Sequence, residues 1–334
     1  MAGKGMRWLV LAWLAWCSIG CAKAGDPCAA PFDTAASYAS RIAAVACAEH
    51  RLWYSPFLDA NGRLASITVA EAENARLQDG MTPAWRRVAD YWKGSGLLWQ
   101  SAARYGASEC SVPNPVPMQS AACRAFVVDT PWSATFVSFV MARAGLPGFA
   151  PSASHVDYVR SAWGDAGSPY RLADPEREPA STGDLLCFAR GHAPMGHAGL
   201  VGFLQAGDGN GLAMHCDIVV GANVEGDNRL HLVGGNVLQG VTARVLNLNR
   251  SGLLWALPKR EPLATCTPAN DSGCNFNRQD WVALLKLKPL PPPATPPPAM
   301  PPTAPHSCCV QCALPMPAGM RRCPLTPTQL RRWR

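Results

Sequence analysis

Charged residues are scarce in this chain, and no excess of one sign remains once its two ends are set apart. They make up 16% of the 334 residues against 48% hydrophobic residues, so the chain can form a core and is not disordered as a whole. The formal charge of +7 comes from residues 1–24 and 289–334, which hold three and five basic residues and no acid. The 22 basic and 23 acidic residues between them leave a neutral body. The sequence therefore gives no support for nucleic-acid binding, which needs massed Lys and Arg, and we expect no nucleic-acid partner.

The chain also lacks an apolar run of the roughly 20 residues that cross a bilayer. The run Trp8–Ile19 is shorter, follows Lys4 and Arg7, and precedes the small residues of Ala22–Ala24, which is typical of an export signal. Residues 1–24 are predicted to be a signal peptide. We expect a periplasmic or secreted protein with no transmembrane span after signal removal.

Cys21 offers a second interpretation of the N-terminal segment. Ser18–Cys21 resembles a bacterial lipoprotein box, in which the cysteine carries a lipid anchor, although an aliphatic residue is usual in place of Ser18. Cleavage after Ala24 and a lipid anchor at Cys21 both place the mature protein outside the cytoplasm, and the sequence leaves both open.

Cysteine is abundant, and its count agrees with export. Of 14 cysteines, two lie in the signal, and the remaining 12 are an even number, as expected for disulfides in an oxidising compartment. The close pairs Cys110/Cys123 and Cys266/Cys274 flank loop-like segments and are predicted to staple them, while spacing alone leaves the overall connectivity open. Near the C-terminus, His306 and four cysteines lack a second element to fix a tetrahedral site. We therefore predict no metal and no cofactor.

Residues 289–334 are predicted to form a separate tail. They contain 14 prolines, with runs at 291–293 and 296–298, so the segment should be an extended polyproline-type arm. Residues 25–288 contain no internal repeat. We expect one domain there, with a helical part over residues 32–165 and a sheet part over residues 183–288.

Helix signals precede strand signals in this domain. Helices are predicted over Phe32–Glu49, from the capping box Thr68–Glu71 toward Leu77, from Thr82-Pro83 to Gly94, from Thr130-Pro131 to Gly145, and from near Ser154 through Trp163. Short apolar runs predict strands over residues 185–188, 217–221, 230–233, 241–248 and 253–257. Helices followed by strands favour an α+β fold, with the helices packed on one side of a small antiparallel sheet.

The start of the helix after Thr130 is the best candidate for chemistry. If Thr130 caps this helix, Ser133 lies in its first turn, where unpaired backbone amides and the positive end of the dipole stabilise an anion. A nucleophile gains from that position, and the amides can stabilise a developing oxyanion. A serine there also commonly caps the helix or faces solvent, so the helix alone does not establish a nucleophile.

Two histidines compete as the general base. His215 begins a predicted strand, whose alternation places His215 and Asp217 on one face and Cys216 on the other. His197, in a Gly-rich stretch, is the alternative. Asn236 follows two glycines and is placed to orient an imidazole, as the third member of a triad does, although a turn alone also explains an Asn there.

Several motifs resemble known bacterial families. PWSATFVSFVMARAGL is similar to the nucleophile helix of papain-like cell-wall hydrolases, namely the NlpC-type peptidases and the cysteine–histidine-dependent amidohydrolase/peptidase domains. GDLLCFARG and HCDIVVGANVEGDNRLHLVGGN resemble the strands that follow in those enzymes. These motifs, with GGNV and the closing CNFNRQDWVALL, also resemble an uncharacterised family described only as a domain of unknown function. The resemblance covers roughly Ala35–Leu287.

The resemblance implies a papain-like, NlpC-type α+β fold acting on peptidoglycan peptides or a related envelope amide. Ser133 would be the nucleophile, His215 the base and Asn236 the orienting group. It favours His215 over His197, because His215 keeps a short strand–turn–strand distance to Asn236. The first-turn amides would form the oxyanion site.

The same comparison implies a substrate site and an alternative function. Trp132 would wall the cleft, and His155 and Asp217 would bind substrate, although His155 is also interpreted as a packing histidine. Ser133 stands where the peptidases carry cysteine, and a hydroxyl does not ionise near neutral pH as a thiol does. The alternatives are a catalytically inactive module that binds envelope peptides or peptidoglycan, and a structural envelope protein.

Overall fold

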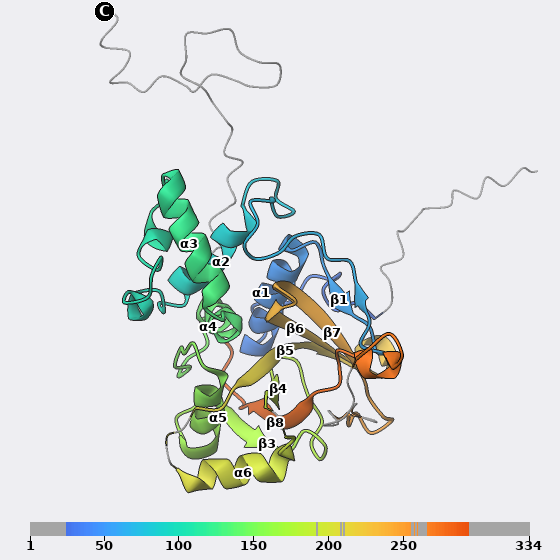
Figure 1. The fold of residues 1–334 in the computed structure, drawn as a ribbon. Coiled ribbons are helices and arrows are strands. Elements are labelled where there is room, and N and C mark those ends of the chain that lie inside the picture. The colour runs from blue at the N-terminus through green and yellow to red at the C-terminus, as the bar shows by residue number, and fades with distance from the viewer. Residues whose placement is uncertain are drawn as a thin grey trace, which may run out of the picture.

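The computed structural model describes residues 25–293 except 192, 208, 210, 255, 256, 258 and 260–265. This part of the chain contains six α-helices and eight strands (Figure 1). The helices are α1 (Tyr38–Leu52), α2 (Ala84–Gly94), α3 (Pro117–Asp129), α4 (Ser133–Ala144), α5 (His155–Gly164) and α6 (Gly196–Ala206). The strands are β1 (Phe57–Leu58), β2 (Leu64–Ala65), β3 (Tyr170–Ala173), β4 (Leu185–Ala189), β5 (Met214–Ala222), β6 (Arg229–Val237), β7 (Gly240–Asn247) and β8 (Asp280–Leu287).

The predicted ends of the chain lie mostly outside the described residues. This holds for the signal peptide, for Cys21 and for residues 294–334 of the proline-rich tail. Residues 289–293 are described, and Leu290 packs against the core. In the described part, no single helix has the length and apolarity to cross a membrane, and only the pair α3–α4, bent by 101°, passes that test together.

All eight strands form one sheet, in the order β2-β1-β7-β6-β5-β4-β8-β3. Its pairs are antiparallel except for β1 with β7. The α+β class is therefore as predicted, but the sheet is larger than expected. The difference arises because β1, β2, β3 and β8 were not predicted; β8, from the far end of the domain, inserts between β4 and β3.

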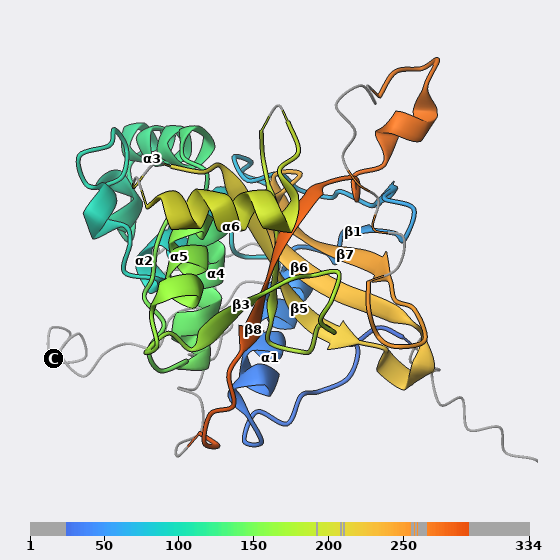
Figure 2. The ribbon, with the colours of Figure 1, turned by 90° about the horizontal axis from the view of Figure 1, so that it is seen from below.

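The sheet divides the hydrophobic core into two clusters. Alternate residues of β4 point to opposite faces, with Leu185 and Cys187 in the larger cluster and Leu186 and Phe188 in the smaller one. Helices α1 and α4 pack against β5 and β6 in the larger cluster, and Figure 2 shows α2, α4 and α5 gathered on the same side. Helix α5 also contacts β5, so α4 and α5 both approach that strand.

The starts of α2, α4 and α5 were predicted near their observed positions, whereas α1 begins at Tyr38 and not at Phe32, and the capping box at Thr68 does not form a helix. The segment from Thr68 to Leu77 is irregular, and the Glu71 carboxylate accepts from the indole of Trp132 instead of a local backbone amide. Of the strand predicted over residues 253–257, positions 255 and 256 lie outside the described residues, and Leu254 forms an isolated bridge with Leu248.

Helix α6 shows why some elements had no local signal. The amides of Met195 and Gly196 donate to the carboxylate of Asp280, which caps the start of the helix from strand β8. Because the capping residue is more than 80 positions away, the Gly-rich local sequence did not predict the helix. Helix α3 and the short strands β1 to β3 were likewise not predicted.

Four disulfides are present among the described residues. Cys110–Cys123 and Cys266–Cys274 confirm the two predicted loop staples, and Cys28–Cys47 and Cys187–Cys216 add two that spacing did not predict. Cys187 and Cys216 are opposite one another in the β4–β5 ladder, so their bond joins two central strands. Such a content of disulfides is typical of proteins outside the reducing cytosol.

Candidate active site

Ser133 is the first residue of helix α4, as the sequence predicted for a position in the first turn. The helix begins three residues after Thr130, because Thr130 ends α3 and Pro131 separates the two helices. Trp132 is the N-terminal cap, and its side chain makes no capping hydrogen bond. The first-turn amides of α4, the turn that begins with Ser133, have no acceptor within the helix.

The imidazole that contacts Ser133 is that of His155. Ser133 Oγ lies 2.9 Å from His155 Nε2, and the two residues are 6% and 4% exposed. His155 is the first residue of α5, and its other ring nitrogen, Nδ1, is buried without a hydrogen-bond partner in the described structure. The predicted contact between Ser133 and His215 is therefore replaced by one to a histidine that we interpreted as a substrate-binding or packing residue.

His215 and Asp217 share one face of β5, as the alternation predicted. His215 Nε2 lies 2.7 Å from Asp217 Oδ1, and both residues are almost completely buried. Cys216 points the other way, where it bonds to Cys187. The ring of His215 also lies beside that of His155, with 5.3 Å between their centroids. The starts of α4, α5 and β5 thus converge on one cluster.

Both ring nitrogens of His215 are occupied. Arg190 Nη2 lies 3.2 Å from His215 Nδ1, and a guanidinium can only donate, so Nδ1 accepts. The ring proton is consequently on Nε2 and is donated to Asp217. In this arrangement His215 has no lone pair left for Ser133, which is the physical reason that the base predicted from the sequence differs from the one in contact.

Asp217 is held from its other side by Arg244. Arg244 Nε donates to Asp217 Oδ2 at 2.9 Å, and Arg244 Nη1 donates to Asn277 Oδ1 at the same distance. Arg244 is 3% exposed, so this is a buried ion pair. Asp217, predicted to bind substrate, instead orients His215 in the structure.

Burial sets the charge of the cluster. It lowers the pKa of His215 although Asp217 opposes the shift. Burial, assisted by His215 and Arg190, lowers the pKa of His155 well below its ordinary value. Burial alone would raise the pKa of Asp217, but His215 and Arg244 outweigh it and the pKa falls. The site thus contains two neutral imidazoles and one carboxylate at neutral pH.

Asn236 was predicted to orient an imidazole, but its side chain contacts Glu71 and the backbone of Trp132. Its side chain, with the amide nitrogen toward the carboxylate, donates to Glu71 Oε2 at 3.0 Å and accepts from the backbone N–H of Trp132 at 3.3 Å. A Cβ on Gly235 would lie 2.4 Å from Phe136, so a glycine is needed where β6 approaches α4. Asn236 therefore anchors the strand to the residue before Ser133.

Trp132 lies inside the core, where we had predicted a cleft wall. It is completely buried, stacks on Trp53 with 6.0 Å between ring centroids, and donates its indole N–H to Glu71 Oε2 at 2.7 Å. Burial raises the pKa of Glu71, although the Trp132 hydrogen bond opposes the shift. Trp132 and Glu71 thus support the start of α4 from behind.

A cavity of about 270 Å³ adjoins the cluster. Its lining includes Arg190, His215, Asn236 and Arg244, together with apolar side chains, while Ser133 is not part of it. No group of three or more His, Cys, Asp or Glu side chains suited to a metal ion occurs in the part of the chain that the structure describes.

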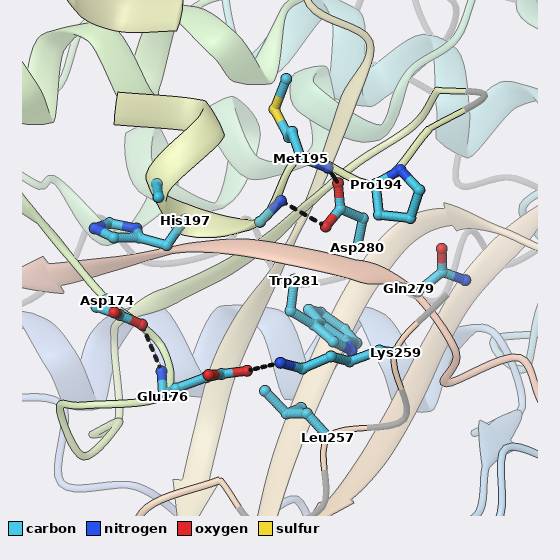
Figure 3. Close-up of a pocket in the computed structure, with 12 residues that line it drawn as sticks. Asp174, Glu176, Pro194, Met195, His197, Leu257, Lys259, Gln279, Asp280 and Trp281 are labelled. Carbon is cyan, nitrogen blue, oxygen red and sulfur yellow. Dashed lines mark hydrogen bonds and ion pairs between the residues drawn. The ribbon is translucent and has the colours of Figure 1, made fainter. Parts of the chain in front are cut away.

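His197, the rival base, lines a different cavity of about 330 Å³ (Figure 3). His197 Nδ1 donates to the carbonyl of Val282 at 2.7 Å. Its surroundings include Trp281 and the ion pair between Lys259 and Glu176. The structure therefore places His197 with β8 and its neighbours, in a cavity whose lining does not include Ser133.

Residues 79–287, more than half of the chain, match the model of a bacterial family described as an uncharacterized protein conserved in bacteria (DUF2272). The chain belongs to this family. The match covers Ser133, His155, His215 and Asp217, so the whole cluster lies within the family domain. No curated protein and no solved structure matches the chain significantly.

The stability of this family member should fall below pH 6.5. Burial is the largest cause of the lowered pKa of His50, His155 and His215. Below pH 6.5 the unfolded chain therefore binds more protons than the folded chain. The free energy of unfolding consequently decreases as the pH is lowered. Each histidine contributes about 1.4 kcal/mol per pH unit between its unfolded and folded pKa.

Urea unfolding with the disulfides intact, measured between pH 7.5 and 5.5, tests this expectation. His155→Gln should reduce the slope by one histidine's share, because glutamine does not titrate. Stability that is constant or rises as the pH falls through this window would contradict the neutral state of the buried imidazoles.

Three residues of the site were not predicted from the sequence. Arg190 directly follows β4, and the pairing of Phe188 with His215 in the next strand could have indicated that it lies near His215. Arg244 interrupts the apolar strand β7, and a lone arginine there predicts a buried partner. Glu71 carried only the misleading capping-box signal.

Proposed function

We propose that this protein is an exported amide hydrolase with a papain-like, NlpC-type fold, in which Ser133 is the nucleophile and His155 the general base. The substrate class is peptidoglycan peptides or a related envelope peptide. The contact of 2.9 Å between Ser133 Oγ and His155 Nε2 at the start of α4 carries the proposal. The motif resemblance, the export signal and the disulfides support the fold and a periplasmic or secreted location.

The lowered pKa of His155 keeps its imidazole neutral, and so able to accept a proton, at neutral pH. A neutral imidazole can accept the Ser133 proton as Oγ attacks the amide carbon, and the resulting imidazolium then protonates the leaving amine. Water, activated by the same histidine, hydrolyses the acyl-enzyme and restores the hydroxyl. In the accepting tautomer the ring proton is on Nδ1, which has no partner within the described residues, so a substrate acceptor would complete the site.

Two further features would stabilise charge during the reaction. The first-turn amides of α4 are placed to donate to an oxyanion formed next to Ser133. The negative charge of Asp217 favours the imidazolium form of His155 during proton transfer, whereas burial opposes it. His215 lies between them and is held neutral, so it separates Asp217 from the reacting pair without adding a second positive charge.

One observation favours a second candidate, a module that binds envelope peptides without cleaving them. The cavity of about 270 Å³ is lined by His215, Arg190 and Asn236, whereas Ser133 is not part of it and is 6% exposed. A peptide bound in the cavity would contact the cluster without reaching the hydroxyl unless the site opened.

Incubation of the purified mature protein with muropeptides tests the hydrolase proposal, with new products detected by mass spectrometry. We expect cleavage by the unaltered protein and a loss of about a thousandfold or more in Ser133→Ala, because removal of a nucleophile removes the covalent route. Ser108→Ala, an exposed serine, is the matched control and should cleave normally. Intact muropeptides that remain bound to the unaltered protein would contradict cleavage and favour the binding module.

A further inference from the structure

The charged side chains that line the cavity beside His215 are both positive. Two arginines line it, Arg190 and Arg244, and no Asp or Glu is among its lining residues. Arg244 is committed to Asp217, Asn277 and the carbonyl of Phe276. Among the described residues that line the cavity, Arg190 is the cation that remains available to a ligand.

Arg190 has donors to spare. A guanidinium carries five N–H donors, and the contact to His215 Nδ1 accounts for one of them. No carboxylate in the described part of the chain forms an ion pair with Arg190, whose side chain is exposed beside the ring of Phe188. Although part of the side chain is exposed, neighbouring protein atoms partly desolvate the guanidinium and lower the pKa of Arg190; Asp217 opposes this shift, and an anionic ligand would oppose it too. Arg190 is therefore held in place by His215 and Phe188, and no other side-chain hydrogen bond joins its guanidinium to the described residues.

The remaining lining residues indicate which chemical groups of a ligand would fit next to its anionic group. Phe188, Val237 and Phe276 provide apolar walls, and Asn236 provides an amide next to the start of α4. A planar carboxylate matches the fork of a guanidinium, and a small apolar side chain matches the walls. Peptides that end in a free carboxylate next to a small apolar residue combine both features.

We propose that this cavity binds the C-terminal carboxylate of a peptide through Arg190. The inference rests on the proposed function only in making that peptide the substrate of Ser133, because binding itself needs no cleavage. The hydrolase would accordingly act near the C-terminal end of a peptide and discriminate against peptides whose end is amidated.

Calorimetric titration of the mature Ser133→Ala protein with two probes tests the proposal without turnover. The probes are N-acetyl-Ala-Ala and its C-terminal amide. We expect the acid to bind about 10- to 100-fold more tightly, as a hydrogen bond to a charged group provides. Arg190→Gln should abolish this preference, Arg190→Lys should keep part of it, and Arg104→Gln, which removes an exposed charge elsewhere, should leave it unchanged.

The outcomes separate this inference from the proposed function. Equal affinities for acid and amide, no binding of either probe, or a preference that persists in Arg190→Gln would overturn the carboxylate site. Preference for the acid by a protein that cleaves no muropeptide would uphold the site and refute the hydrolase. Cleavage that is indifferent to the peptide terminus and to Arg190 would uphold the hydrolase and refute the site.

Discussion

Replacing His155 with glutamine should lower kcat/KM for muropeptide cleavage by about a thousandfold. In the proposed mechanism the neutral imidazole accepts the Ser133 proton, a role worth roughly 10²- to 10⁴-fold. Glutamine keeps a polar group but has no basic lone pair of comparable strength. The measurement is steady-state cleavage of a defined muropeptide, followed by chromatography at several pH values.

His197→Gln is the matched control for this prediction. His197 donates to a backbone carbonyl of β8 and lines another cavity, so its loss should change kcat/KM less than about threefold, an order-of-magnitude bound for a residue outside the site. Circular dichroism would show that both variants are folded. Cleavage that survives in His155→Gln and fails in His197→Gln would contradict His155 as the base and identify His197, the alternative from the sequence, in its place.

Replacing Arg244 with methionine should reduce the free energy of unfolding by about 3–5 kcal/mol. Asp217 would stay buried beside His215 but lose the guanidinium that neutralises it, and an unpaired buried charge is strongly destabilising. Methionine fills much of the same volume, which limits the effect of a new cavity. Urea unfolding at pH 7.5, with the disulfides intact, measures the change.

Arg171→Met provides the comparison for an exposed ion pair. Arg171 pairs with Glu178 on the surface, where such pairs contribute about 0–1 kcal/mol. A loss in Arg244→Met no larger than that in Arg171→Met would show that the Asp217 charge is compensated in another way, for instance by protonation. Its unfolding would then depend on pH near neutrality, which the same experiment detects.

The local parts of the site could be predicted from the sequence. Thr130-Pro131 indicated the helix start that carries Ser133, and the period of two in β5 placed His215 and Asp217 on one face. Both predictions depend on residues within a few positions of one another. The two loop disulfides were predictable for the same reason.

The partners of these residues depend on contacts between distant segments and were missed. His155 reaches Ser133 because α5 returns to the start of α4. Arg190, directly after the neighbouring strand β4, donates to the remaining ring nitrogen of His215. Glu71 was predicted to cap a helix, but the indole of Trp132 and the amide of Asn236 provide it with buried donors from farther along the chain. Sequence spacing does not show whether Glu71 accepts from these distant donors or from a local backbone amide, because burial in the folded structure decides which hydrogen bonds must form.

The networks around Ser133 have separable roles. Trp132, Glu71 and Asn236 fix the start of α4, whereas Arg244, Asp217 and His215 form a chain that ends at Arg190. His155 belongs to neither network and is the imidazole that contacts the Ser133 hydroxyl among the histidines that the structure describes. Catalysis should therefore respond to His155 and Ser133, while stability should respond to Arg244.

Covalent labelling with a fluorophosphonate, mapped by peptide mass spectrometry, measures most directly whether the Ser133 hydroxyl is activated by His155. We predict a single adduct on Ser133 in the mature protein at pH 7.5, lost in His155→Gln and retained in His197→Gln. A folded protein whose Ser133 stays unlabelled, or is labelled equally well without the His155 imidazole, would contradict activation of Ser133 by His155.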